Sequence, residues 1–404
     1  QPQRPAMPDR RPAPVPAERK PAPAAPAPRA KERNAGMGFI TLVFIALAFL
    51  SLVWAFNNIH PDSGSSVGAA SGSKLDLVSK FDVYINNAAS DALGDLAYIR
   101  KVYKIDENAL AGQKPNPANY GTTPAVVQQV IDSAADLLEG QSLAWDPNVD
   151  FYPGSQIEYY YDETILAIAW KELINNKVCT FAEVKIADGS QLRRMIANNS
   201  YGSDVQLYPT DMAASANAVI AISGDYYIFR QLGITVYQRQ LYRFAPKSVD
   251  SCFFTASGDM LFSRAGEMSS QEEAQQFITD NDVTFAVAFG PVMVDNGQLA
   301  EFGSYPIGEN NRTYSRTAIG QRDKLHYILM TINYEDDHSV AATVSEAAEY
   351  IFSKGVVKAY ALDGGQTSTM VMNGHTVNRP DWGNQRTQSD IIYFATALPE
   401  EVNP

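Results

Sequence analysis

From Asp150 onward, short runs of β-branched, aromatic and other apolar residues alternate with turn residues, and this pattern most limits the possible folds. Runs of this kind predict strands. The strands that we expect are residues 159–170, 178–187, 218–222, 226–229, 234–237, 283–289, 325–332, 356–362 and 391–395. Ser270 and Thr343, each followed three residues later by Glu, are typical helix starts. Strands and helices in irregular order predict an α+β domain with a mixed β-sheet over residues 151–398.

Residues 37–56 contain no charged side chain and are long enough to cross the ~30 Å hydrocarbon core of a membrane. The hydrophobic part of a signal peptide is shorter, and no convincing small-residue cleavage site follows this run. Arg29, Lys31 and Arg33 precede the run, and the next Lys or Arg after it is Lys74. The positive-inside rule therefore predicts a single-pass protein with a cytoplasmic N-terminus and its main domain outside the cell membrane.

The segments around this predicted transmembrane helix have distinct compositions. Residues 1–36 are rich in Pro and Ala and lack large apolar groups, so we expect a disordered cytoplasmic tail. Residues 57–73 are rich in Gly and Ser and predict a flexible linker. In residues 74–150 apolar side chains recur at helical spacing, which predicts a helical juxtamembrane segment.

The charge is distributed unevenly along the chain. Residues 1–36 contain eight Lys or Arg and three Asp or Glu, a net charge of +5, whereas the whole chain has −13 and the remainder therefore −18. An acidic body argues against nucleic acid as a partner, because nucleic-acid-binding domains carry basic patches. The acidic net charge is also unfavourable for a substrate that carries phosphate, so any arginine that binds the phosphate group must act through local contact.

The sequence predicts no metal or other cofactor. Cys179 and Cys252 lack the spacing of a zinc site, and either one disulfide or two buried thiols is consistent with them. The acidic residues 335–337, followed by His338, resemble a calcium-ligand cluster only weakly, because the glycine and the spacing of an EF-hand loop are absent.

The predicted strand 356–362 ends at a carboxylate, Asp363, followed by Gly364, Gly365, Gln366 and three hydroxyl residues. Adjacent glycines permit positive φ and let a ligand approach the backbone closely. Together with the hydroxyls of Thr367 and Ser368, the free N–H groups predict a small concave anion site with the acid at its lip. The alternative is an ordinary turn in which the carboxylate bonds its own backbone.

Further motifs accompany this turn. They are Gly290-Pro291 with a later glycine, the segment Arg316-Thr317-Ala318-Ile319-Gly320, Asn378 and Arg386. In this order and spacing, roughly the C-terminal half resembles the phosphodiester glycosidase family, which includes the lysosomal enzyme that uncovers mannose 6-phosphate by removing N-acetylglucosamine. The chain looks like a bacterial, membrane-anchored member. It departs from the family pattern at Gln366, where a third glycine is usual, and at Ser223-Gly224-Asp225, which replaces an Asn-Gly pair.

The resemblance implies a set of site residues. Asp363 and Asp225 are the implied catalytic carboxylates, and Arg316 and Arg386 are the implied phosphate ligands. Carboxylates stabilise the positive charge that develops at the anomeric carbon, and the arginine fork matches two phosphate oxygens. The remaining implied substrate-binding residues are Gly364, Gly365, Thr367, Ser368 and Asn378.

These expectations describe an extracytoplasmic hydrolase that cleaves glycosyl-phosphodiester linkages in cell-envelope glycopolymers such as exopolysaccharide, or in glycoconjugates. Because Gln366 and Ser223 depart from the family pattern, a non-catalytic module that binds wall or capsule polymers remains open. A third alternative is a scaffold of an envelope assembly complex that acts through the Pro-rich tail.

Overall fold

The computed structural model describes residues 103–302, 311–335, 340–400 and 402. They lie in one compact unit, Leu96–Pro404. The predicted tail, transmembrane helix and linker, residues 1–73, lie outside the described residues. Within the described ranges, no helix is long and apolar enough to span a membrane.

The largest sheet has nine strands in the order β1-β2-β3-β4-β15-β14-β16-β12-β13. Its strands are β1 (Tyr120–Gly121), β2 (Glu158–Asp162), β3 (Ile165–Ile174), β4 (Lys177–Ile186), β12 (Val292–Asp295), β13 (Gln298–Leu299), β14 (Arg316–Asp323), β15 (His326–Asn333) and β16 (Lys358–Leu362). All ten residues of β4 are buried, which is expected of a central strand covered on both faces. The sheet begins before residue 151, because β1 pairs with β2.

Two five-stranded sheets complete the β-structure, with strand orders β10-β9-β11-β7-β8 and β18-β17-β6-β19-β5. Their strands are β5 (Leu192–Ile196), β6 (Ala218–Ser223), β7 (Gly233–Tyr237), β8 (Gln240–Ala245), β9 (Ser251–Thr255), β10 (Met260–Ser263), β11 (Val283–Val287), β17 (Met370–Met372), β18 (His375–Thr376) and β19 (Asp390–Ala395). Every pairing among the described strands is antiparallel. One core cluster contains buried side chains from all three sheets, such as Phe254, Tyr327 and Phe394.

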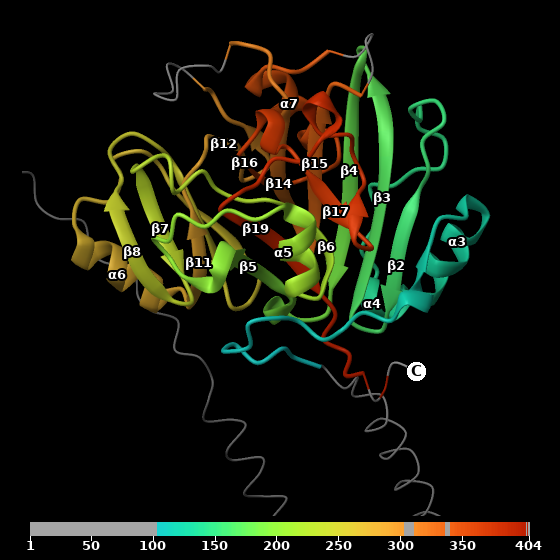
Figure 1. Ribbon diagram of the computed structural model, residues 1–404, viewed down its shortest axis with the longest axis horizontal. Coiled ribbons are helices and arrows are strands. Elements are labelled where there is room, and N and C mark those ends of the chain that lie inside the picture. The colour runs from blue at the N-terminus through green and yellow to red at the C-terminus, as the bar shows by residue number, and fades with distance from the viewer. Residues whose placement is uncertain (1–102, 303–310, 336–339, 401, 403–404) are drawn as a thin grey trace, which may run out of the picture. The chain divides into compact units, whose positions relative to one another are not determined.

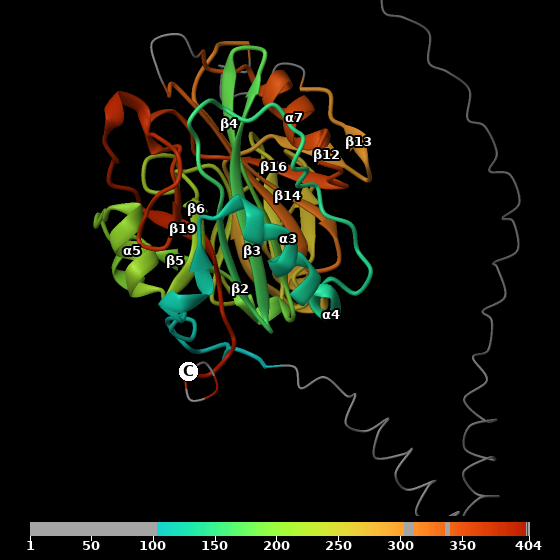
Figure 2. The same ribbon diagram turned by 90° about the vertical axis from the view of Figure 1, so that its right-hand side faces the viewer.

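Five α-helices cover the outer faces of the described sheets: α3 (Pro124–Ser133), α4 (Ala135–Leu138), α5 (Pro209–Ser215), α6 (Gln271–Asp280) and α7 (Val344–Phe352). Figure 1 shows α6 beside β8 and α5 in front of the sheet that contains β6 and β19. Figure 2 shows α3 and α4 outside β2 and β3. The α+β class is confirmed, with helices on the outside of sheets that share one core.

Several local predictions can be compared with this fold. Thr343 and Glu346 form the expected capping box at the start of α7. The predicted strand 159–170 is two strands, β2 and β3, joined by a turn. The prediction of a strand at 226–229 is wrong, because the amides of Phe229 and Arg230 bond the Tyr226 carbonyl and close a turn. Cys179 and Cys252 are free and buried, so the two-thiol alternative holds.

Candidate active site

The ends of β6 and β16 lie side by side and bring the two predicted carboxylates together. The backbone N–H of Asp363, just after β16, donates to the Gly224 carbonyl at 3.1 Å. Asp225 follows Gly224 directly, so two acids that are distant in sequence share one site. The two predicted catalytic carboxylates, Asp363 and Asp225, are therefore close together in the folded protein.

The turn after β16 needs its glycines. A Cβ on Gly364 would lie 2.5 Å from the Ser315 carbonyl oxygen, so this position accepts only the smallest residue without a shift. Gly365 has φ +63° and donates its N–H to the same oxygen at 2.8 Å. The Thr367 hydroxyl donates to the Gly364 carbonyl at 2.5 Å and ties the turn together. These contacts hold the backbone at Asp363 in one conformation.

Two of the predicted substrate-binding residues are engaged inside the protein. The Ser368 hydroxyl donates to the Arg316 carbonyl at 2.8 Å. Asn378 donates to Asn333 at 2.7 Å and to the Ser368 carbonyl at 2.9 Å, and its side-chain oxygen accepts from the Met370 N–H. Both side chains are buried. Their contacts support the turn from behind.

Asp363 lines a pocket of about 200 Å³ together with Phe289, Tyr314, Arg316 and the two glycines of the turn. Burial raises the pKa of Asp363 to about 7; the Thr367 hydroxyl and Arg230 oppose the rise, and the charges of Asp225 and Asp390 add to it. A carboxyl group with this pKa exchanges its proton readily at neutral pH, which is the property of a general acid or base.

Asp225 lies behind this pocket and is fully enclosed. Its Oδ1 accepts from the Tyr226 N–H at 2.6 Å, and its Oδ2 accepts from the Ala288 N–H at 2.8 Å. Phe289 and Gly290, which follow Ala288, form part of the pocket wall. Asp225 therefore ties the backbone at Tyr226 and Ala288 together and helps to hold the wall of the pocket in place.

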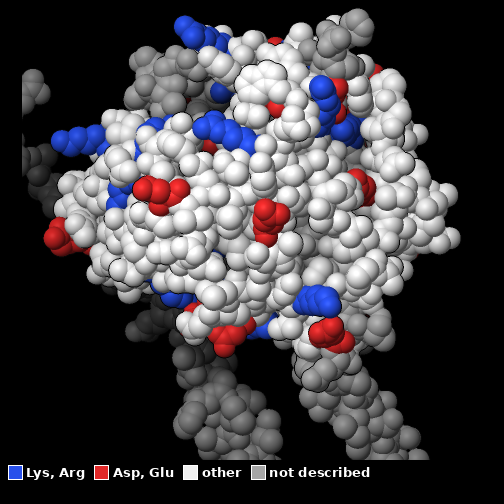
Figure 3. Space-filling model, in the orientation of Figure 1, with Lys and Arg blue, Asp and Glu red and all other residues white. Residues whose placement is uncertain are grey.

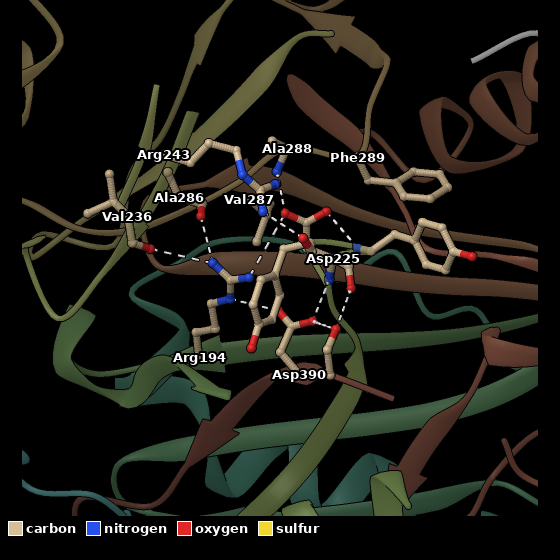
Figure 4. Close-up of polar contacts among 12 residues, drawn as sticks. Arg194, Asp225, Val236, Arg243, Ala286, Val287, Ala288, Phe289 and Asp390 are labelled. Carbon is tan, nitrogen blue, oxygen red and sulfur yellow. Dashed lines mark hydrogen bonds and ion pairs between the residues drawn. The ribbon is translucent and has the colours of Figure 1, made fainter. Parts of the chain in front are cut away.

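A third carboxylate, Asp390 at the start of β19, joins the pair through Arg194 of β5, and sequence reasoning missed both residues. The Arg194 Nε donates to Asp390 at 2.6 Å, and its Nη2 lies 3.9 Å from Asp225 (Figure 4). Asp390 also accepts the Asp225 N–H at 2.9 Å. Burial raises the pKa of Asp390 to about 6, with Arg194 opposing the rise. No local motif marks either residue, because each lies in an ordinary strand.

A third missed residue is Arg230, which follows the turn after Asp225. Its Nη2 donates to the carbonyls of Ala288 and Phe289 at 2.9 and 3.0 Å, and its guanidinium lies over the Phe289 ring at 4.5 Å. Within the described residues, its Nε and Nη1 make no hydrogen bond. Arg230 is therefore a cation that lies against Phe289, a residue of the pocket wall, and two of its nitrogens make no hydrogen bond to the described residues.

The two predicted phosphate ligands occupy different places. Arg316 lines the pocket, but its Nε donates to the Ala342 carbonyl at 2.9 Å and its Nη2 to the Arg312 carbonyl at 2.7 Å. Arg386 is exposed and lies over the ring of Phe229 at 6.0 Å. Phe229 in turn stacks on Tyr226, the neighbour of Asp225. Several Lys and Arg side chains surround the upper part of the face seen in Figure 3, although the net charge is −13.

A larger cavity of about 550 Å³ lies between residues 104–110 and the strands β5 and β7. Its cations are already engaged: Arg193 bonds the Ala109 carbonyl, and Arg239 lies 2.9 Å from Glu107 and contacts Asp282. None of the predicted site residues lines it. Of these two pockets, only the smaller one is lined by Asp363, the glycine turn and Arg316, so we place the site there.

In the part of the chain that the structure describes, no group of three or more His, Cys, Asp or Glu residues is arranged to hold a metal ion. The weak calcium candidate, residues 335–338, lies mostly outside the described residues.

Asp363, a carboxyl group that titrates near neutrality, and Arg316 line one pocket, and Asp225 and Arg230 contact the backbone of its wall; this is a site of the hydrolase type. Residues 216–395 match the model of the phosphodiester glycosidase family, and this segment is a phosphodiester glycosidase domain. The match includes Asp225, Arg230, Asp363 and Asp390 and supports phosphodiester glycosidase activity. A sequence search of curated proteins finds no match.

The solved structures that are similar to the chain include the following two. One is the catalytic domain of zebrafish N-acetylglucosamine-1-phosphodiester alpha-N-acetylglucosaminidase, auto-inhibited by its pro-peptide; the identity is 14%, the TM-score 0.47, and the match covers 61% of this chain and 86% of that one. The other is a hypothetical protein from Synechocystis, with 14% identity, a TM-score of 0.44 and coverage of 60% of this chain and 64% of that one.

Proposed function

We propose that the protein hydrolyses glycosyl phosphodiesters in cell-envelope glycopolymers or glycoconjugates, outside the cytoplasm. The observation that carries this proposal is Asp363, a carboxyl group with a pKa of about 7 on the wall of a pocket of about 200 Å³. Larger pockets, of about 300–1,000 Å³, hold drug-sized ligands, so a single sugar ring is a fitting occupant. The location rests on the predicted transmembrane helix, residues 37–56.

In the proposed reaction, the bond between the anomeric carbon and the phosphate oxygen breaks. The phosphomonoester leaves with that oxygen and the bonding electron pair, and the oxygen of water bonds to the anomeric carbon. Asp363 accepts the proton of this water and returns it to the solvent. Asp225 and Asp390 lie close enough to interact electrostatically with Asp363, and carboxyl groups beside the sugar stabilise the positive charge developing at the anomeric carbon.

The negative charge of the phosphate needs an opposing cation at the same pocket. Arg230 suits this role, because its Nε and Nη1 have no hydrogen-bond partner among the described residues and its guanidinium is fixed by two carbonyls and the Phe289 ring. Arg316 lines the pocket and contributes positive charge there, although carbonyls occupy its Nε and Nη2. We therefore place Arg230 first among the phosphate ligands.

Turnover of a panel of synthetic sugar 1-phosphodiesters tests the proposal. We expect the wild-type chain to release free sugar and a phosphomonoester, and Asp363→Asn to lower turnover by about 10²–10³-fold or more while still binding a sugar 1-phosphate. Asp204→Asn is the matched control, because Asp204 is exposed. If Asp363→Asn keeps more than about a tenth of the activity, Asp363 is a turn residue. Binding of wall polymer without any turnover would favour the non-catalytic module instead.

A further inference from the structure

Trp382 combines unusual exposure with an unusual backbone conformation. Its side chain is 77% exposed, more than any other large hydrophobic residue among those described. Its φ of +60° and ψ of 14° lie in the left-handed region, which a bulky residue rarely adopts. Burial of the indole offsets none of this strain. A strained residue that contributes so little packing points to a function outside the fold itself.

Short contacts fix Trp382 at the rim of the proposed active site. It lies in the 3₁₀ turn η5 (Asp381–Gly383), where Asp381 accepts a hydrogen bond from the Ser315 hydroxyl at 2.6 Å. Ser315 lines the pocket, and its carbonyl holds Gly365 of the Asp363 turn. The Trp382 carbonyl also accepts from the Asn384 side chain at 3.3 Å. The backbone is anchored to the pocket wall, while the indole lies in solvent.

Phe229 is another exposed aromatic residue near the site, and other side chains already lie against its ring. Phe229 is 48% exposed, but it stacks on Tyr226 at 4.7 Å and Arg386 lies over its ring at 6.0 Å. No ring or cation among the described residues lies against the faces of Trp382. An indole with an open face, held rigidly, suits the apolar C–H face of a sugar ring, because it offers a large apolar area with little loss of conformational freedom.

We propose that Trp382 is a binding platform for a sugar ring on the leaving-group side of the scissile phosphate. The proposal rests on the proposed function and adds a substrate class: phosphodiesters whose second alcohol belongs to another sugar. The pocket of about 200 Å³ has room for the sugar that is released, so the group beyond the phosphate must lie outside the pocket, at the rim where Trp382 stands.

The test compares two substrates of the same sugar 1-phosphate, one esterified to methanol and one to a second sugar. For the full-length protein, we expect Trp382→Ala to raise KM for the disaccharide phosphodiester at least tenfold more than KM for the methyl ester. Trp382→Phe should recover most of this difference. Trp382→Asn, whose residue type tolerates a left-handed backbone, separates loss of the ring from misfolding. Tyr242→Ala is a control, because Tyr242 is an exposed aromatic residue of β8. This strand belongs to a different sheet from β14 and β16, which contribute residues to the pocket wall.

Intrinsic fluorescence distinguishes failure of this inference from failure of the proposed function. Trp382 is the most exposed described tryptophan, so the disaccharide phosphodiester should shift the emission of Asp363→Asn protein and not that of Asp363→Asn/Trp382→Phe protein. A shift without any wild-type turnover would support the platform and refute hydrolysis. Normal turnover with equal KM changes for both substrates and no emission shift would overturn the platform.

Discussion

Replacing Asp363 by Asn should stabilise the protein at alkaline pH, and the pKa of Asp363 gives the magnitude. The difference between the ordinary value of 3.8 and a value of about 7, at about 1.36 kcal/mol per pH unit, corresponds to at most about 4 kcal/mol. The side chain is partly exposed, so solvent screens the charge, and we expect about 2 kcal/mol. Asparagine has the shape of the protonated acid and carries no charge to bury.

The direction of the pH dependence follows from the two protonation states. Below about pH 4, Asp363 is protonated in both the folded and the unfolded chain, so its raised pKa has no effect on stability. Between about pH 4 and 7, the unfolded chain loses the proton first, and the wild-type protein becomes less stable as the pH rises. Above pH 7 the folded protein carries the charge, and the destabilisation is complete. The gain from Asp363→Asn should therefore be largest at pH 8 and less than half as large at pH 5.

Urea unfolding of the full-length protein in mild detergent measures this gain, provided that the slope m is the same for both proteins. Asp204→Asn serves as the control for the loss of an exposed carboxylate. A less stable Asp363→Asn protein at pH 8 would mean that the carboxylate is ionised and favourably paired in the folded state. The general-base role of Asp363 would then lose its physical basis.

Four further predictions concern other parts of the molecule. Arg230→Lys should weaken binding of a sugar 1-phosphate about tenfold in calorimetry, because a lysine cannot keep the fork and the ring contact; unchanged affinity would exclude Arg230 from the site. Gly364→Ala should destabilise the fold by about 1–3 kcal/mol and reduce turnover, because its Cβ would lie 2.5 Å from the Ser315 carbonyl oxygen; an unchanged melting temperature would contradict this. Arg194→Met should destabilise by about 3–5 kcal/mol, measured by urea unfolding, because Asp390 would remain buried without its partner. Protease added to spheroplasts should remove the mass beyond residue 60 and spare the N-terminal tail, whereas a protected main domain would refute the predicted topology.

Several features of the site follow from local sequence, because they depend on residues that are close neighbours in the chain. The strand that ends at Asp363, the glycines after it and the capping box at Thr343 all form as expected. The hairpin at Asn373-Gly374 is local in the same way, since both residues adopt the positive φ that their types favour. In each case the backbone preference and the hydrogen-bonding groups lie within a few residues of each other.

Other features depend on which strands become neighbours, and no local pattern contains that information. Asp390 begins β19 and Arg194 lies in β5, and only the pairing of these strands beside β6 buries them against Asp225. Arg230 reaches the pocket wall because residues 226–229 form a turn, where the apolar pattern predicted a strand. Ser368 and Asn378, chosen for their hydrogen-bonding groups, turn those groups toward the protein interior.

The sequence by itself determined the strand-rich α+β class, the family resemblance of the C-terminal half and the position of Asp363 at a strand end, because periodicity, glycines and motif spacing are local properties. Only the tertiary structure decided how Asp363 titrates. Its pKa depends on burial and on the distances to Asp225, Asp390 and Arg230, which three separate segments bring to one place. Electrostatic energy depends on separation in space and on exclusion of water, and neither quantity can be read from the order of residues along the chain.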